Sequence, residues 1–304
     1  MPSLHPLSAA ALFDLKGWVA VVTGGGTGVG LMMAQTFAAN GAKVYITGRR
    51  TEVLETSASV HGSTESLNNS GGSIVPLTMD VTDKESIKKA VAEIKAQDGF
   101  VSILVNNAGV WKSRPTAGPD AGPEAFGEAM FAENIDDWQE SFMANSTSPY
   151  FVTAAFVPLL TKAVTSATRQ VGCIINNASI SGLLRMTQRQ QYSYNMSKAA
   201  AIHLTRQMAF DLGHEKINIR VNGVALGYFP SEMTTGPSDD KNESSYDVAQ
   251  FQAFFESMGL KTVKRMGSAR DLASAVLTLA TNDYMCGTIT VVDGGSALNL
   301  PGCV

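Results

Sequence analysis

The fold is decided by the stretch Trp18-Val19-Ala20-Val21-Val22-Thr23-Gly24-Gly25-Gly26-Thr27-Gly28-Val29-Gly30. It opens with a short apolar run without polar alternation, which is typical of a parallel strand covered on both faces. The glycine turn leads into a helical stretch at 31–40, closed by Gly41. Glycines let the backbone approach a pyrophosphate, and the free N–H groups of a helix N-terminus attract it. The stretch therefore predicts a nucleotide site, against the alternative of a flexible turn between two core elements.

Strands and helices alternate along the rest of the chain. Further strands are expected at 43–47, 74–79, 102–105, 172–177, 217–225 and 287–292. Helical spacing is found at 51–67, 83–97, 136–162, 193–212, 248–258 and 271–281. Neither an internal repeat nor a linker divides the chain. The pattern predicts an α/β fold, a single Rossmann-type domain over residues 1–304 with a doubly wound parallel sheet between two helical layers.

Three segments depart from this alternation. Residues 1–13 are expected to be a loose leader, and 110–133 an inserted loop near a ligand or, alternatively, a surface excursion. Residues 228–264 are expected to form a substrate lid, with a solvated hinge at 238–245. Pro149 predicts a local kink in the long helix.

Composition restricts the possible partners and location. The formal net charge is -4 and no large Lys/Arg cluster occurs, which argues against nucleic acid or an anionic membrane as partner. No apolar run approaches the roughly 20 residues that span a bilayer, and no secretory signal is evident. The three cysteines, Cys173, Cys286 and Cys303, offer no metal spacing and no even disulfide set, and the first two are expected in the core. We therefore expect a reducing, cytoplasmic location and no metal site.

Tyr194 and Lys198 are four positions apart in an expected helix, so their side chains share one face. A free tyrosine has a pKa of about 10, and a neighbouring cation favours the phenolate. We expect Lys198 to lower the pKa of this phenol, which can then give a proton to an alkoxide or take one from an alcohol. The alternative is an exposed lysine beside a packing aromatic residue.

The end of the second expected strand bears on cofactor choice. In a dinucleotide fold this point faces the adenosine ribose, where an acidic residue would bind the 2′-hydroxyl and repel a 2′-phosphate. The sequence instead has Gly48-Arg49-Arg50, and the planar guanidinium of Arg49 suits a phosphate. This predicts NADP(H) over NAD(H), the alternative being a solvated arginine pair. Asp80, after the third strand, is a candidate acceptor for the adenine amino group.

Together these features resemble a short-chain dehydrogenase/reductase, and residues 12–16 and 228–234 resemble fungal members of that family. The resemblance covers about residues 15–298. Its motifs occur in order: Thr23-Gly24 with Gly28 and Gly30, Asp80, Asn106-Asn107-Ala108-Gly109, Asn145, Ser179, Tyr194 with Lys198, and Val292-Asp293-Gly294-Gly295.

The resemblance implies a role for each catalytic candidate. Tyr194 would be the general acid/base, and Lys198 would lower its pKa and hold the nicotinamide ribose. Ser179 would hydrogen-bond the substrate oxygen, and Asn145 would position a water in a proton relay. Ser181 is the rival serine, but Ser179-Ile180-Ser181-Gly182 matches the Ser-x-x-Gly pattern of the family. The structural alternatives are a capped turn for either serine and a buried amide bridging helix and strand for Asn145.

The implied cofactor contacts are Gly24, Thr27, Gly28, Val29, Gly30, Arg49, Asp80, Val81, Asn107, Ala108, Gly109, Tyr194, Lys198, Gly227 and Ser231. Three departures from the family pattern stand out. Leu226 replaces a proline, Thr27 replaces a basic residue common in NADP-using members, and Ser179 and Tyr194 are 15 positions apart, slightly more than usual. The last suggests an enlarged rim on the substrate pocket.

The leading hypothesis is an NADP(H)-dependent oxidoreductase that reduces a ketone or aldehyde to an alcohol. Apolar candidates for the pocket wall suggest a hydrophobic ketone or a 3-oxoacyl, polyketide-like substrate; they are Trp111, Leu183, Leu184, Met186, Tyr228, Phe229, Phe251, Phe254 and Phe255. Arg114 or Arg185 is a candidate for an acidic group. The alternatives are a non-catalytic NADP(H)-binding regulator and a dehydratase or epimerase. The resemblance also implies a homotetramer or homodimer formed through the helices at 136–162 and 193–212.

Overall fold

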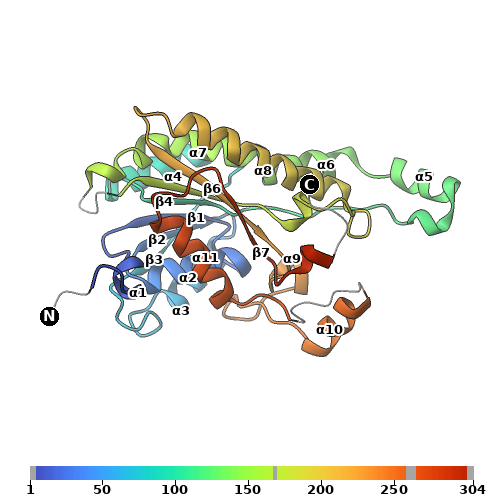
Figure 1. The fold of residues 1–304 in the computed structure, drawn as a ribbon, viewed down its shortest axis with the longest axis horizontal. Helices are drawn as coiled ribbons and strands as arrows, with labels where there is room; N and C mark the ends of the chain where they lie inside the picture. The colour runs from blue at the N-terminus through green and yellow to red at the C-terminus, as the bar shows by residue number, and fades with distance from the viewer. Residues whose placement is uncertain (1–4, 167–169, 258–264, 300–304) are drawn as a thin grey trace.

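A computed structural model describes residues 5–166, 170–257 and 265–299 and is built around one parallel sheet (Figure 1). The strands are β1 (Val19–Thr23), β2 (Lys43–Gly48), β3 (Ser73–Thr78), β4 (Ile103–Asn106), β5 (Gly172–Asn177), β6 (Ile219–Leu226) and β7 (Ile289–Val292). They lie in the order β3-β2-β1-β4-β5-β6-β7, and every neighbouring pair is parallel. The order in which strands are added to the sheet reverses between β1 and β4, which is where a doubly wound sheet binds its ligand. The predicted fold class is confirmed.

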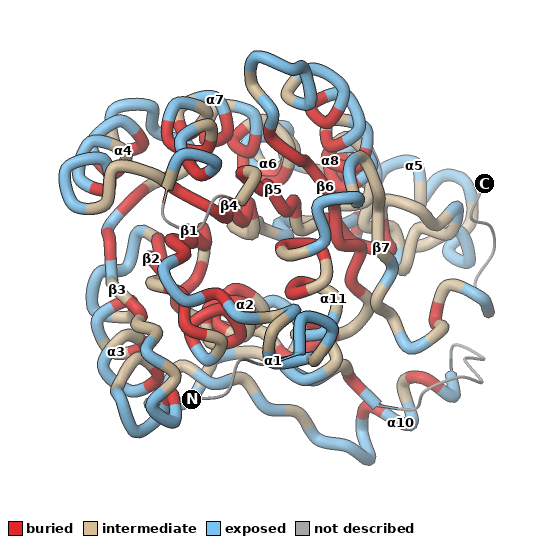
Figure 2. Tube along the Cα trace, turned by 60° about the vertical axis from the view of Figure 1, so that its left-hand side comes forward, coloured by how far each residue is buried: buried red, intermediate tan, exposed pale blue. Residues whose placement is uncertain are grey.

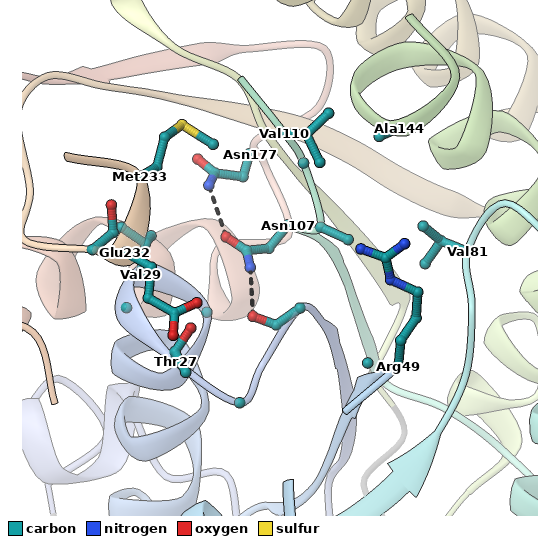
Figure 3. Close-up of a pocket in the computed structure, with 18 of the residues that line it drawn as sticks. Thr27, Val29, Arg49, Val81, Asn107, Val110, Ala144, Asn177, Glu232 and Met233 are labelled. Carbon is teal, nitrogen blue, oxygen red and sulfur yellow. Dashed lines mark hydrogen bonds between the residues drawn. The ribbon is translucent and has the colours of Figure 1, made fainter. Parts of the chain in front are cut away.

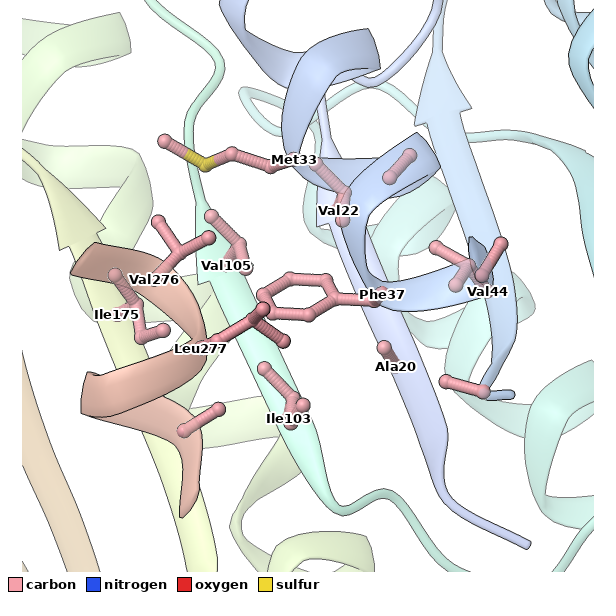
Figure 4. Packing of buried hydrophobic residues seen from close by; sticks show 14 of the residues in the cluster. Ala20, Val22, Met33, Phe37, Val44, Ile103, Val105, Ile175, Val276 and Leu277 are labelled. Atoms are coloured by element: carbon pink, nitrogen blue, oxygen red, sulfur yellow. The ribbon is translucent and has the colours of Figure 1, made fainter. Parts of the chain in front are cut away.

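Helices cover both faces of the sheet. They are α2 (Gly28–Ala39), α3 (Thr51–His61), α4 (Lys84–Gln97), α6 (Ile135–Phe142), α7 (Ser148–Leu160), α8 (Tyr192–Leu212) and α11 (Ala269–Thr281). Successive strand residues point to opposite faces. Ala20 and Val22 of β1 therefore belong to one core with Phe37 of α2 and Leu277 of α11 (Figure 4). Residues of β1 between them belong to a second core with α4 and α7. This explains why the strand carries no polar alternation.

Local signals define several helix ends. The side chain of Asp83 accepts a hydrogen bond from the backbone N–H of Glu85 at 3.0 Å and caps α4. Ser268 and Asp271 form a reciprocal capping box at the start of α11. Other boundaries differ from expectation, because α2 already begins at Gly28 and α3 ends at His61.

The segments expected to be irregular contain more structure than predicted. The leader includes a single helical turn, α1 (Ala9–Leu12), capped by Ser8, while residues 1–4 lie outside the described part. The expected loop at 110–133 contains a 3-10 turn, η1 (Pro119–Ala121), and a helix, α5 (Pro123–Phe131). A proline at the first position of a helix removes no hydrogen bond, so Pro123 begins a helix here. Helix α5 buries none of its residues and projects from the body (Figures 1 and 2).

The long helix expected at 136–162 is interrupted, but one turn before Pro149. A π-helical turn, η2 (Met143–Thr147), separates α6 from α7, and Asn145 lies within it. Pro149 itself is the second residue of α7, directly after this π-helical turn. Such π turns are frequent at functional sites.

The expected lid at 228–264 contains α9 (Glu232–Thr235) and α10 (Val248–Ser257), and residues 258–264 lie outside the described part. The expectation of a solvated hinge at 238–245 is wrong at its centre. The Asn242 amide donates to the backbone oxygen of Val53 at 3.0 Å and to Ser57 Oγ at 2.8 Å, which ties this segment to α3. Cys173 is buried as predicted, but Cys286 is exposed, because it lies in the turn before β7.

Candidate active site

A cleft of about 870 Å³ runs along the carboxyl ends of the central strands. It is lined by residues at or just after the ends of β1 to β6, which is the edge where parallel strands present ligand sites. All fifteen predicted cofactor residues line this cleft: Gly24, Thr27, Gly28, Val29, Gly30, Arg49, Asp80, Val81, Asn107, Ala108, Gly109, Tyr194, Lys198, Gly227 and Ser231. Their contact with a cofactor stays a prediction, but the fold brings them together.

The glycine turn is shaped for close approach. Gly24 and Gly28 have φ of +62° and +51°, a region that residues with a Cβ rarely adopt. A Cβ on Gly30 would collide with the backbone oxygen of Gly24. Thr27, at the N-cap of α2, makes no side-chain cap, so the first N–H groups of that helix are left to an anion. The turn therefore fits a pyrophosphate.

Asn107 braces this turn from the neighbouring strand. Its amide nitrogen donates to the backbone oxygens of Thr23 at 2.9 Å and of Gly24 at 3.0 Å, and its Oδ1 accepts from Asn177 at 2.8 Å (Figure 3). The side chain of Asn107 is thus occupied by the protein, and its backbone N–H donates to Thr23 Oγ1 at 2.9 Å. The sequence analysis did not identify Asn177. The one feature that could have indicated it is a polar residue at the end of an otherwise apolar strand.

The two arginines after β2 have different surroundings. Arg49 lines the cleft, is exposed, and its guanidinium lies beside Val81 in Figure 3. Within the described residues it has no ion-pair partner. Arg50 instead forms an ion pair with Glu232 of α9 at 2.7 Å. Asp80 Oδ1 accepts hydrogen bonds from the backbone N–H and the hydroxyl of Thr82 at 2.9 and 2.7 Å. Arg49 is therefore the cation available to a phosphate.

Lys198 is held at the inner end of the cleft. Its Nζ donates to the backbone oxygen of Asn177 at 2.8 Å and lies 5.8 Å from the centre of the Tyr194 ring. The side chain is buried, and burial lowers its pKa to about 8. Gly182 makes this packing possible, since a Cβ there would lie 2.6 Å from the backbone carbon of Lys198.

The expectation that Lys198 lowers the pKa of Tyr194 is wrong for this structure. Burial raises the pKa of the phenol, and the hydrogen bond with Ser179 lowers it by a smaller amount. The physical reason is that the lysine is itself desolvated and directs its ammonium at Asn177. The phenol is therefore protonated at neutral pH, which suits a proton donor.

Asn145 is fully buried in the π turn between α6 and α7. Its Oδ1 accepts from the backbone N–H of Val110 at 2.8 Å, and its Nδ2 donates to the oxygen of Val110 at 2.9 Å and to Ser197 Oγ at 2.9 Å. The amide thus bridges the helix, the segment after β4 and the helix that carries Tyr194. This is the structural alternative considered above, and the water-positioning role remains a prediction. Ser197 was not foreseen.

The two candidate serines have distinct positions. Ser179 borders the cofactor cleft and also a second cleft of about 610 Å³, together with Tyr194. Ser181 borders only the second cleft, and its hydroxyl donates to Gln188 Oε1 at 2.6 Å. The geometry favours Ser179 for the substrate oxygen.

The second cleft has a partly aromatic wall. Of the expected apolar residues, Trp111, Tyr228, Phe251 and Phe254 line it. Phe255, Leu184 and Met186 pack behind that wall, while Phe229 belongs to the cofactor cleft. Arg114 lines the second cleft, but Arg185 does not. Sequence reasoning missed Gln188 and Arg189, which come from the loop before α8.

The described residues contain no helix that is long and apolar enough to cross a membrane. Across the same ranges, no group of three or more His, Cys, Asp or Glu side chains is arranged to hold a metal ion.

Comparisons with known proteins agree with this geometry. A family model described as short chain dehydrogenase matches residues 18–242. The short-chain dehydrogenase/reductase PhomF of Diaporthe leptostromiformis is 34% identical, covering 95% of this chain and 94% of the relative. The rhamnolipids biosynthesis 3-oxoacyl-[acyl-carrier-protein] reductase of Pseudomonas aeruginosa is 28% identical, covering 96% and 99%. The crystal structure of the NADPH-dependent 3-quinuclidinone reductase of Rhodotorula rubra superposes with a TM-score of 0.73 at 26% identity, covering 98% of this chain and 97% of that one.

Proposed function

Because the chain belongs to the short-chain dehydrogenase/reductase family, and therefore to a family of oxidoreductases, we propose that it uses NADP(H) to reduce a ketone or aldehyde to an alcohol. One observation carries this proposal. Ser179 and Tyr194 line both the cofactor cleft and the second cleft, so a carbonyl entering from the second cleft meets both hydroxyls at the boundary. The cofactor, when bound, supplies the hydride.

In the proposed mechanism the protein supplies orientation and a proton. The Ser179 hydroxyl hydrogen-bonds the carbonyl oxygen and polarises it. As charge develops on that oxygen, the phenol of Tyr194 gives it a proton. The raised pKa of Tyr194 keeps the phenol protonated until that moment. The hydrogen bond with Ser179, which lowers the pKa of this phenol, stabilises the phenolate left behind.

The preference for NADP(H) is supported by Arg49. Its guanidinium is exposed in the cleft and without an ion-pair partner in the described ranges, whereas no carboxylate follows β2 directly to repel a phosphate. One similar reductase is named as NADPH-dependent and another as acting on a 3-oxoacyl carrier protein. We propose an apolar ketone or a 3-oxoacyl, polyketide-like compound as substrate, since aromatic side chains line the second cleft.

We also propose a cytoplasmic homodimer or homotetramer. Helices α6, α7 and α8 carry exposed apolar side chains, among them Ile135 at 71%, Tyr150 at 50% and Phe210 at 87% exposure. A subunit interface over these helices would bury these exposed apolar side chains. Sedimentation of the purified protein tests this; a monomer at micromolar concentration would contradict it.

The test of the reaction follows the absorbance of NADPH, and in parallel NADH, with a panel of apolar ketones and aldehydes. The wild-type protein is expected to oxidise NADPH with at least one carbonyl. Tyr194→Phe is expected to lose about 10²–10⁴-fold in kcat, the usual contribution of a positioned acid, with an unchanged Kd for NADPH. Tight NADPH binding without turnover of any carbonyl would instead identify a regulator, and conversion without change in cofactor absorbance would point to a dehydratase or epimerase.

A further inference from the structure

The rim of the second cleft has an uncommon backbone. Gln188, Arg189 and Gln190 are consecutive and have φ of +50°, +67° and +62°. None of them is a glycine, so each lies in a region that side chains disfavour. Such residues persist only where the surrounding structure holds them, and they cluster at ligand sites.

The structure shows what holds this rim. Gln188 Oε1 accepts hydrogen bonds from Ser181 Oγ at 2.6 Å and from Gln191 Nε2 at 2.9 Å, and its amide nitrogen lies 3.4 Å from the hydroxyl of Tyr228. The rim is thereby tied both to the turn that carries Ser179 and to the aromatic wall. Arg189, the next residue, is placed at the cleft by this anchor.

Two arginines of the cleft are left available for an anion. The guanidinium of Arg189 lies 5.5 Å from the ring centre of Phe254, and that of Arg114 lies 6.0 Å from the ring centre of Trp111. Neither arginine forms an ion pair within the described residues. A guanidinium stacked on a ring keeps its N–H edge free for a carboxylate.

Acidic groups do not neutralise these arginines. Asp247 is the single carboxylate among the described residues that line the cleft, and its Oδ1 accepts from the backbone N–H of Gln250 at 2.9 Å, in the first turn of α10. The charged side chains that line the cleft are therefore two arginines and one aspartate, and the aspartate already accepts a backbone hydrogen bond.

The remaining wall is aromatic. The Tyr228 ring contacts Phe251 and Phe254 edge-on, with ring centres 5.9 and 5.7 Å apart. The wall is therefore apolar and aromatic, which suits a ligand body that is apolar and contains a ring.

We propose that this cleft binds a carbonyl compound with a ring-containing apolar body and a carboxylate, and that Arg189, assisted by Arg114, receives the carboxylate. The inference rests on the proposed reduction, because it names the substrate class of the same site. The anion site and the reduction can be tested independently, because ligand binding and turnover are measured in separate experiments.

The test compares keto acids with their neutral esters. The probes are 4-acetylbenzoate and 3-(4-acetylphenyl)propanoate, each against its methyl ester, with saturating NADPH. The acid of at least one pair is expected to have a kcat/KM at least ten times that of its ester. Arg189→Gln is expected to lower kcat/KM for that acid by about 10–100-fold, the range of a charged hydrogen bond, chiefly through KM. The same variant should leave the ester within about 3-fold, and Arg189→Lys should restore part of the loss.

Arg185→Gln is the matched control. Arg185 lies in the same loop but outside the cleft, so this variant should treat acid and ester as the wild type does. Thermal melting shows whether each variant folds. Esters that react as well as their acids, or an Arg189→Gln variant that slows both alike, would overturn the anion site while leaving the reduction intact.

Binding is measured separately by titration calorimetry on the Tyr194→Phe protein saturated with NADPH. There, the acid is expected to bind at least ten times more tightly than its ester, and Arg189→Gln to remove that difference. Should no probe be turned over while this binding pattern holds, the reduction fails and the anion site stands. Equal binding of acid and ester would refute the site whatever the kinetics.

Discussion

Arg50 and Glu232, 182 positions apart in the chain, join the two sides of the cofactor cleft through a two-pronged ion pair, with Nη1–Oε1 at 3.2 Å and Nη2–Oε2 at 2.7 Å. Arg50 is the N-cap of α3 beside the expected phosphate site, and Glu232 is the first residue of α9 in the segment expected to be a lid. The pair therefore engages the second arginine of the Arg49-Arg50 dipeptide and places a negative charge in the cleft where we propose that NADP(H) binds.

Glu232→Gln is expected to tighten NADPH binding by about 3–10-fold, because it frees Arg50 and removes a repelling carboxylate. NADH, which lacks the 2′-phosphate, should gain less. Both side chains are partly exposed, so the free energy of unfolding should change by less than about 1 kcal/mol. Fluorescence titration with both cofactors measures this. Glu85→Gln, which breaks the exposed pair with Lys88 away from the cleft, is the control. Weaker NADPH binding in Glu232→Gln would show that the ion pair instead supports cofactor binding by holding the two sides of the cleft together.

Arg49→Ala is expected to raise the Kd for NADPH by about 10–100-fold and to leave the Kd for NADH within about 3-fold. The reason is that a charged hydrogen bond to phosphate contributes about 1.5–3 kcal/mol, and NADH makes no such bond. Isothermal titration with each cofactor gives both constants. An equal loss for both cofactors would contradict the assignment of Arg49 to the 2′-phosphate.

Gly30→Ala is expected to abolish cofactor binding and to destabilise the protein, because the added methyl group collides with the backbone oxygen of Gly24 in the turn braced by Asn107. Gly127→Ala is the matched control. No atom lies within 4 Å of a Cβ added at Gly127 in the middle of α5, so this change should stabilise by about 0.5–1 kcal/mol. Urea unfolding and cofactor titration of both variants measure the contrast, and a Gly30→Ala protein that bound NADPH normally would refute the tight-turn account.

Lys198 should make stability depend on pH. Its pKa in the fold is about 8, against 10.5 ordinarily, so between these values the unfolded chain holds the proton and the folded one does not. The free energy of unfolding therefore rises with pH in this window. Below pH 8 the folded protein carries the full cost of burying a charged Lys198. From pH 7 to pH 9 the gain should be about 1 kcal/mol. The raised pKa of Tyr194 keeps that group neutral over the same range.

The measurement is urea unfolding of the cofactor-free protein at pH 7 and pH 9, compared with Lys198→Met. Subtracting the variant removes the contribution of every other titrating group. Relative to the variant, the free energy of unfolding of the wild type should be about 1 kcal/mol higher at pH 9 than at pH 7. A difference that does not vary with pH would mean that the lysine is solvated in the folded state.

Periodicity and turn chemistry determined the fold on their own. The unbroken apolar run at 18–23 predicts a covered parallel strand, and the glycines between that strand and a helix favour a nucleotide site over a flexible turn. The same local logic located all seven strands. Local patterns failed where the structure depends on distant residues. A proline that can end one helix can also begin another, as Pro123 does. The polar stretch 238–245 is held by hydrogen bonds to α3, which is far away in sequence.

The residue types of the site could also be inferred from the sequence, since a phenol and an ammonium one helical turn apart must share a face. What they do to each other was decided by tertiary structure. Burial raises the pKa of Tyr194 and lowers that of Lys198, because desolvation depends on the elements packed around a group, which no local pattern records. The same holds for Asn177, Gln188 and Arg189. Their roles come from contacts with strands, turns and rings that the folded chain alone brings within reach.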